Sequence, residues 1–161
     1  FIIRGTLEIL PVLADGVFDK GAAGLGILTS SAGLGALTAG LTKALMPSQF
    51  DGRLPRPALI SALLGTGLVP IVGISTSWEL SLLLIVLMGY TSSLAGISMQ
   101  TAIQVDLQDH MRGRVMSLWV MVGVGAAAAG AITLGFLVEL FGFSPALGVV
   151  GIAGFLFLVQ Y

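Results

Sequence analysis

Five long stretches of this chain contain no charged residue at all. Each is at least about 20 residues long, the length at which a helix rising 1.5 Å per residue crosses a hydrocarbon core of roughly 30 Å. The stretches are 21–42, 57–78, 80–105, 115–138 and 140–161. Because a backbone amide left unpaired in lipid costs several kcal/mol, each stretch is expected to be a helix that closes its own hydrogen bonds. The sequence therefore predicts an all-α, polytopic membrane protein.

Composition excludes the main alternatives to a helical membrane bundle. Charged residues make up 9% of the chain, where about a quarter is usual for a soluble domain, and the mean hydropathy is +1.04. The apolar runs are continuous, so they lack the alternation of membrane β-barrel strands. With no cysteine and one histidine, His110, the chain is expected to hold neither a metal nor another cofactor. A net charge of −1 argues against a nucleic-acid partner, which leaves the lipid bilayer as the main one.

Six membrane segments are predicted, and they form a single bundle. The first, 1–14, is too short to span a bilayer and contains Arg4 and Glu8, so we interpret it as the outer part of a helix whose beginning is missing. The chain also stops while it is still apolar, and we expect it to be a fragment of something longer. The other predicted segments are 21–45, 56–75, 79–104, 113–138 and 145–161.

Basic residues are distributed unevenly between the two ends of the predicted bundle. One end receives Lys43, Arg53, Arg56, Arg112 and Arg114, whereas the other receives only Lys20. The positive-inside rule then places loops 46–56 and 105–114 in the cytoplasm, and the protein in the inner (plasma) membrane as a multi-pass protein. Trp78 and Trp119 lie near predicted helix ends, where an indole ring anchors a helix at the headgroups.

Small residues recur at four-residue spacing within the predicted helices. The sets are Ala32 with Ala36 and Gly40, Ala126 with Gly130, and Ala131 with Gly135. This spacing lets two helix backbones approach closely in lipid. Tight packing is one interpretation, and the other is a smooth face on which helices slide during alternating access.

Two segments around the second cytoplasmic loop resemble a known family. A polar QTAIQ segment at 100–104 closes one predicted helix, and an RGRVMSLW segment at 112–119 opens the next. Together they resemble the junction of the tenth and eleventh helices in major facilitator superfamily transporters, most of all the branch of transmembrane secretion effectors and siderophore-exporter-like permeases. The similarity covers nearly the whole chain. It implies the C-terminal six-helix half of that fold, with the first helix truncated.

The resemblance also implies a function and two partners. Proteins of this superfamily are secondary transporters that rock one half against the other, so the implied partners are a small-molecule substrate and the missing N-terminal half of the same chain. The superfamily's loop motif of Gly, Asp and Gly-Arg is present in degenerate form as Gly40, Asp51, Gly52 and Arg53. The branch implies proton-coupled efflux of a small amphipathic molecule by alternating access.

Arg4, Glu8 and Asp15 are the ionisable candidates for a transport path. Arg4 and Glu8 lie one helical turn apart in the first segment, at membrane depth. Ionisable groups there are expensive, so they usually face a cavity or one another and mark a substrate or proton path. The alternative is an i,i+4 pair of mutually neutralising charges. Glu8 is the preferred proton carrier, and Asp15, at the expected water boundary, is the second candidate.

Uncharged polar residues gather in the segment 79–104. They are Tyr90, Thr91, Ser92, Ser93, Ser98, Gln100, Thr101 and Gln104. Gln100, Thr101 and Gln104 are the preferred residues for lining an aqueous cavity. The alternative is structural, because Ser and Thr hydroxyls also bond the carbonyls of their own helix.

A cluster of charged residues marks the cytoplasmic start of the 113–138 segment. Arg112 and Arg114 flank Gly113, and Asp109 is placed to cap the helix. These residues are predicted to form a cytoplasmic ion-pair gate with loop residues 51–53. Anchoring by the positive-inside rule is the alternative.

Two other functional classes compete with transport. A non-transporting scaffold, or the permease subunit of a larger complex, would be expected to have large docking loops, and the loops here are short. An enzyme in the membrane would need a catalytic constellation that His110 and scattered carboxylates do not provide. No phosphate-binding GxxxxGK[ST] loop is present, so the chain itself is not predicted to hydrolyse ATP.

Overall fold

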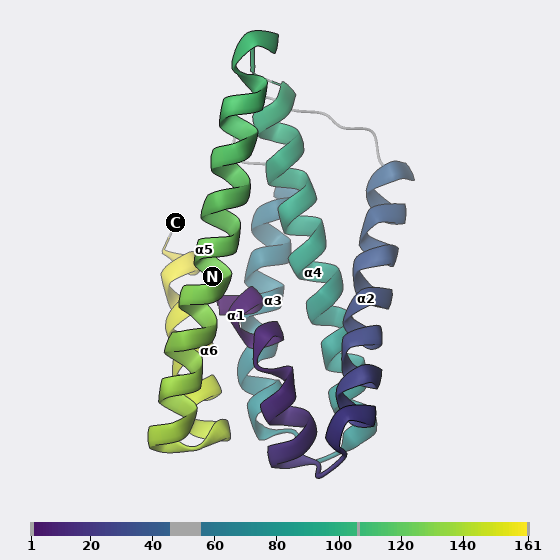
Figure 1. Cartoon of the computed structure of the whole chain (residues 1–161), viewed down its shortest axis with the longest axis vertical. Helices are drawn as coiled ribbons and strands as arrows, with labels where there is room; N and C mark the ends of the chain where they lie inside the picture. Colours follow the sequence, from purple (N-terminus) through teal and green to yellow (C-terminus); the bar gives the residue numbers. More distant parts are fainter. Residues whose placement is uncertain (1, 46–55, 106, 161) are drawn as a thin grey trace.

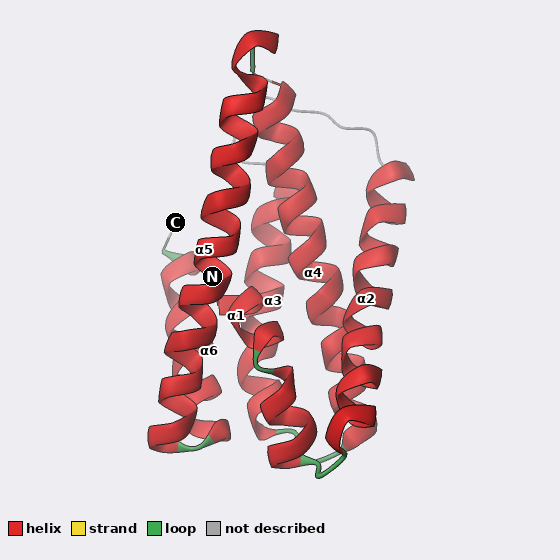
Figure 2. Ribbon diagram, viewed as in Figure 1, coloured by secondary structure: helices red, strands yellow, loops and turns green. Residues whose placement is uncertain are grey.

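The charge-free stretches form the long helices of the structure. A computed structural model describes residues 2–45, 56–105 and 107–160, and every regular element within them is helical (Figure 2). The elements are α1 (Ile2–Glu8), a π-helix η1 (Val12–Val17), α2 (Gly21–Leu45), α3 (Arg56–Ile74), α4 (Trp78–Val105), α5 (Asp109–Phe141) and α6 (Phe143–Val159). Four of the helices, α2 to α5, are long and apolar enough to cross a membrane. The all-α fold class is confirmed.

The first segment differs from the single helix predicted over 1–14. Helix α1 ends at Glu8, and a π-helix follows that ends at Val17. Pro11 lies at the break, and because it has no N–H it cannot donate to the carbonyl of Leu7 one turn earlier. The wider turn is visible in the Phe18 N–H, which donates to the carbonyl of Leu13, five residues back, at 3.3 Å.

Helix α5 is longer than the segment predicted over 113–138. It has 33 residues, which gives a length of about 50 Å at 1.5 Å per residue. Charge-free sequence marks only the apolar part of α5, whereas the helix continues past it to Asp109 and Phe141. Residues 109–112, which precede the predicted segment, therefore belong to the first turn of α5.

The helices form two layers. Figure 1 shows α2, α4 and α5 in the nearer layer with the short α1 between them, and α3 and α6 behind. Helix α4 packs against α2 and α3, α3 packs against α6, and α1 packs against α5. The fully buried core side chains come from both layers and include Leu28, Ile85, Met88, Leu134 and Leu147.

Glycines let the helix backbones touch at several crossings. A Cβ added at Gly35 would collide with the carbonyl of Val86, and one added at Gly89 with the carbonyl of Ala32, so α2 and α4 meet reciprocally at glycine. Between α1 and α5, a Cβ at Gly5 would lie 2.8 Å from the carbonyl carbon of Gly130. Tight packing is thus what the small residues Ala32 and Gly130 do in this structure.

The close approach at Gly89 predicts opposite effects of alanine at two glycines of α4. Gly89→Ala should destabilise the intact protein by about 1–3 kcal/mol, because a backbone carbonyl must move. Gly96→Ala adds its methyl group to open space and should stabilise it by about 0.5–1 kcal/mol through reduced chain entropy. Thermal unfolding in detergent micelles measures both, and equal shifts of the two midpoints would contradict the packing account.

Candidate functional site

Arg4 and Glu8 lie on the exposed side of α1. The buried side of this segment consists of Gly5, Thr6, Ile9 and Leu10, and the helical period separates the two sides. Both charged side chains are exposed, and in the described residues no salt bridge joins them. The structure therefore holds the guanidinium and the carboxylate one turn apart without the pairing that the alternative interpretation requires.

Asp15 continues the same charged side. The sequence placed it in a loop, but it lies inside η1, where it is exposed while its neighbours Leu13 and Ala14 are buried. Arg4, Glu8 and Asp15 thus form one exposed charged column along α1 and η1. All three side chains are exposed, whereas Gly5 and Thr6 of α1 and Leu13 and Ala14 of η1 are buried.

The charged column faces away from the interior of the bundle. On the opposite side of α1, Ile3 lies against Gly65 of α3 and Ile2 against Gly154 of α6, while Gly5 touches α5. Figure 1 shows α1 in front of the rear helices, with α5 on one side and α2 on the other. The column consequently lies on the face bounded by α2 and α5, which we call the open face.

The two helices that border the open face are the least buried of the four long helices. In the most apolar 18 residues of α3 and of α4, 39% of residues are buried, against 22% in α2 and 17% in α5. Exposed large side chains of α5 include Leu118, Met121 and Val124. The open face is therefore a surface that this chain does not cover by itself.

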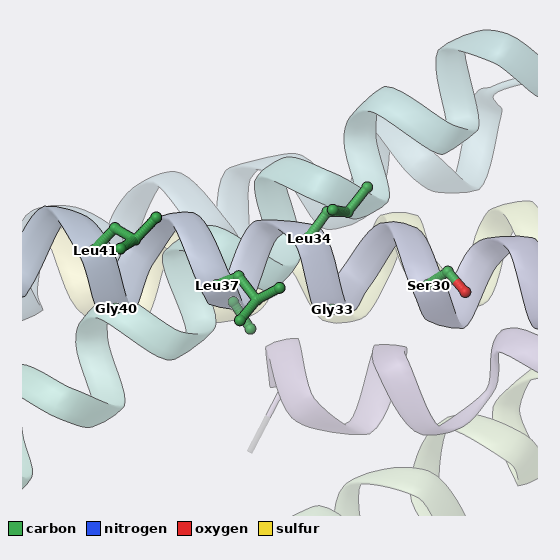
Figure 3. Close-up of a pocket in the computed structure, with 7 residues that line it drawn as sticks. Ser30, Gly33, Leu34, Leu37, Gly40 and Leu41 are labelled. Carbon is green, nitrogen blue, oxygen red and sulfur yellow. The ribbon is translucent and has the colours of Figure 1, made fainter.

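A shallow apolar groove follows the outward side of α2. It has a volume of about 850 Å³, and Figure 3 shows its labelled residues along α2 alone. The lining residues are Ser30, Gly33, Leu34, Ala36, Leu37, Gly40 and Leu41. No charged group lines it, so the groove is suited to lipid chains or another apolar helix and not to a charged substrate.

The polar residues of α4 divide into two kinds. The hydroxyl of Thr101 donates a hydrogen bond to the carbonyl of Ile97 at 2.8 Å, so its proton is not available to a substrate. Gln104 donates through Nε2 to Sδ of Met116 on α5 at 3.5 Å, and Gln100 lies half-buried one turn away. The two glutamines keep most of their hydrogen-bonding capacity.

Ser98 is a polar residue of α4 that is not among the preferred cavity residues Gln100, Thr101 and Gln104. Its side chain is 2% exposed, and its Oγ has no hydrogen-bond partner among the described residues. Residue type alone does not show this, because the nearby Thr91 bonds the carbonyl of Leu87 in the usual way. Spacing offers the one usable signal, since Ser98 follows the buried Thr91 by seven residues, or two helical turns.

The charged residues at the start of α5 are only partly arranged as predicted. Arg112, Gly113 and Arg114 lie exposed in the first two turns of the helix. The N-cap is Gln108 in an extended conformation, so the expected capping by Asp109 is wrong. Asp51, Gly52 and Arg53 lie outside the described residues, and the ion-pair gate that includes them stays a prediction.

Carboxylates are scattered over the described part of the chain. Its residues contain no group of three or more His, Cys, Asp or Glu side chains that could hold a metal ion. Each carboxylate of the open face, Glu8 and Asp15, can carry charge and accept hydrogen bonds.

An apolar helical bundle in which four long helices could each cross a membrane is an integral membrane protein. The family profile of the transmembrane secretion effectors matches residues 3–160. The chain belongs to this family, within the major facilitator superfamily.

Curated relatives agree with this assignment. The chain is 31% identical over 132 residues to the enterobactin exporter EntS of Shigella flexneri, covering 81% of this chain and 31% of the relative. It is 32% identical over 130 residues to the enterobactin exporter EntS of Escherichia coli O127:H6 (strain E2348/69 / EPEC), covering 80% and 30%. The chain thus spans about a third of the length of these relatives. No solved structure matches it.

The unpaired hydroxyl of Ser98 predicts that its removal is harmless to stability. Ser98→Ala should leave the free energy of unfolding unchanged or raise it by about 1 kcal/mol, because a desolvated polar group is lost with no hydrogen bond. Ser81→Ala is the matched control, since the equally buried Ser81 donates to Oγ of Ser75 at 2.9 Å. It should destabilise by about 1 kcal/mol. Chemical unfolding in micelles compares the two, and a larger loss for Ser98→Ala would show that its hydroxyl has a partner.

Proposed function

We propose that this chain is the C-terminal membrane bundle of a secondary transporter that exports a small amphipathic molecule by alternating access. The observation that carries the proposal is the charged column of Arg4, Glu8 and Asp15, exposed on a face bordered by two poorly buried helices. Charged groups at that depth require water or a substrate beside them. A second bundle across the open face would enclose such a cavity.

The substrate class and the direction of transport rest on the relatives. They are described as enterobactin exporters, so enterobactin itself is the natural probe. Gln100 and Gln104, from the half-buried side of α4, are proposed to offer neutral hydrogen-bonding groups in the cavity. The lipid bilayer and the N-terminal half of the same protein are the proposed partners.

The orientation in the inner membrane is part of the proposal. Lys43 lies in the last turn of α2, and Arg112 and Arg114 lie in the first turns of α5. Figure 1 shows that these two helix ends are at the same end of the bundle, opposite the turn between η1 and α2 that contains Lys20. The positive-inside rule then favours a cytoplasmic location for residues 46–56 and 105–114.

A non-transporting membrane scaffold or permease subunit is the second candidate. The uncovered apolar sides of α2 and α5 would also suit a protein that only docks other membrane segments. A scaffold gives no reason for a charged column on its docking face, so this candidate is tested directly by neutralising the column.

Glu8 is proposed as the proton carrier. Replacing its carboxylate with the amide of glutamine tests this role. In inverted membrane vesicles that contain the intact protein, Glu8→Gln should lower proton-driven enterobactin uptake by at least about tenfold, because an amide cannot carry a proton in exchange for substrate. Expression and insertion should stay unchanged. Glu139→Gln is the control, since Glu139 is an exposed carboxylate near the end of α5. This variant should transport enterobactin at the normal rate.

The outcomes separate the two candidate functions. Normal proton-driven uptake by Glu8→Gln would remove the proton-carrier role while leaving transport in place. Absence of uptake in the unaltered protein, with enterobactin and with unrelated amphipathic probes, would favour the scaffold.

The predicted gate is tested by a charge exchange between Asp51 and Arg114. Asp51→Arg and Arg114→Asp should each lower transport by about threefold or more, because each puts like charges together. The double variant should recover most of the loss, since the opposite charges are restored. Initial rates in the same vesicles measure this. If Arg114 only anchors the helix end, Arg114→Lys will be normal and the double variant will be no better than the worse single variant.

A further inference from the structure

An aromatic and cationic cluster joins two distant parts of the chain at the end of the bundle where η1 ends. The rings of Phe18 and Trp78 form a T-shaped pair with centroids 5.2 Å apart and planes at 74°. The Nζ of Lys20 lies 5.1 Å from the centroid of the same Trp78 ring. We call Phe18, Lys20 and Trp78 the tryptophan clamp. The sequence alone predicts Trp78 as a lipid anchor and does not reveal its two partners.

One side of the clamp is fastened to η1 by the backbone. The N–H of Phe18 donates to the carbonyl of Leu13 at 3.3 Å, and that of Lys20 to the carbonyl of Ala14 at 2.9 Å. Asp19 and Gly21 have positive φ angles of 50° and 54°, and this tight reversal turns the chain from η1 into α2. The positions of Phe18 and Lys20 therefore follow that of η1.

The other side of the clamp is fixed to α4. Trp78 is the first residue of that helix, and the turn before it is held by the hydroxyl of Ser81, which donates to Ser75, and that of Ser75, which donates to the carbonyl of Ser77 at 3.2 Å. Gly24 of α2 leaves room for the Lys20 side chain, because a Cβ there would collide with it, while the Cη2 atom of the indole would lie at an ordinary contact distance of 3.4 Å.

We propose that the tryptophan clamp is a conformational latch that joins the turn after η1 to the start of α4, so that η1 leaves the bundle only when the clamp opens. The other end of η1 adjoins the break at Pro11, where the helix is interrupted. Leu13 and Ala14 of η1 are buried in the core, and the clamp adds an aromatic and cationic contact at the end of η1 that lies away from this break. Aromatic pairing and cation–π contact both need close geometry, so a small displacement of η1 removes both together.

Labelling of a buried cysteine in η1 tests the latch, with no requirement for transport. The chain has no cysteine of its own, and Ala14, which is 1% exposed, is replaced by Cys in the intact protein purified in micelles. Trp78→Leu should raise the initial rate of maleimide labelling at Ala14→Cys by about fivefold, the factor expected when an aromatic pair is lost. Phe18→Leu should act in the same direction. Leu13→Cys is the second reporter if Ala14→Cys does not fold.

Two controls separate a latch from a general loss of packing. Trp119→Leu removes the other tryptophan and should leave the labelling rate at Ala14→Cys unchanged. Ala39→Cys, buried on α2 away from the clamp, should stay unlabelled in the Trp78→Leu background. An unchanged rate at both η1 reporters would overturn the proposal, and so would an equal rise at Ala39→Cys.

Discussion

The structure depends on the requirement that every backbone polar group be paired without help from water. Helices meet this requirement internally, so the membrane segments of this chain are helical whatever their side chains are. Lipid also removes the hydrophobic drive that joins helices in water, and what remains is contact between backbones at small residues. Gly35 with Gly89 and Gly5 with Gly130 supply that contact at two of the main crossings.

These glycine contacts explain why one side of α2 is occupied and the other is not. Gly24, Leu28, Ser31, Gly35 and Ala39 form the buried side of α2, and the last part of that side meets α4. The outward side offers Gly33, Ala36 and Gly40 as a second smooth surface. Small residues facing lipid give a helix poorer packing than Leu or Val would, so a second smooth side makes physical sense only where something packs or moves against it. The proposed second bundle provides such a surface.

The helical spans can be predicted from the sequence because charged residues are costly in hydrocarbon, so a segment that crosses the membrane contains few of them. The helix ends cannot, since α5 continues past its apolar part to Asp109 and Phe141. Residue type and spacing are enough to place Arg4 and Glu8 one turn apart on a helix, but they place Asp15 in a loop. They do not predict the π-helix that contains Asp15. This helix follows the interruption of the regular helix at Pro11 and packs against α2, a distant part of the bundle. The tryptophan clamp joins Lys20 to Trp78, far along the chain, and no local pattern encodes such a contact.

The charged column also limits which mechanisms are physically reasonable. Arg4 and Glu8 expose opposite charges on the same side of α1 and do not neutralise each other by a salt bridge. Such groups are stable within a membrane only beside water or a charged partner, which is why the proposed transport function requires water on the open face. The apolar groove along α2 and the exposed apolar residues of α5 border that surface and need a dry environment. The proposed transport path requires a wet centre with dry edges, as in a cavity sealed at its sides by helix packing, whereas a plain docking surface would have a dry centre.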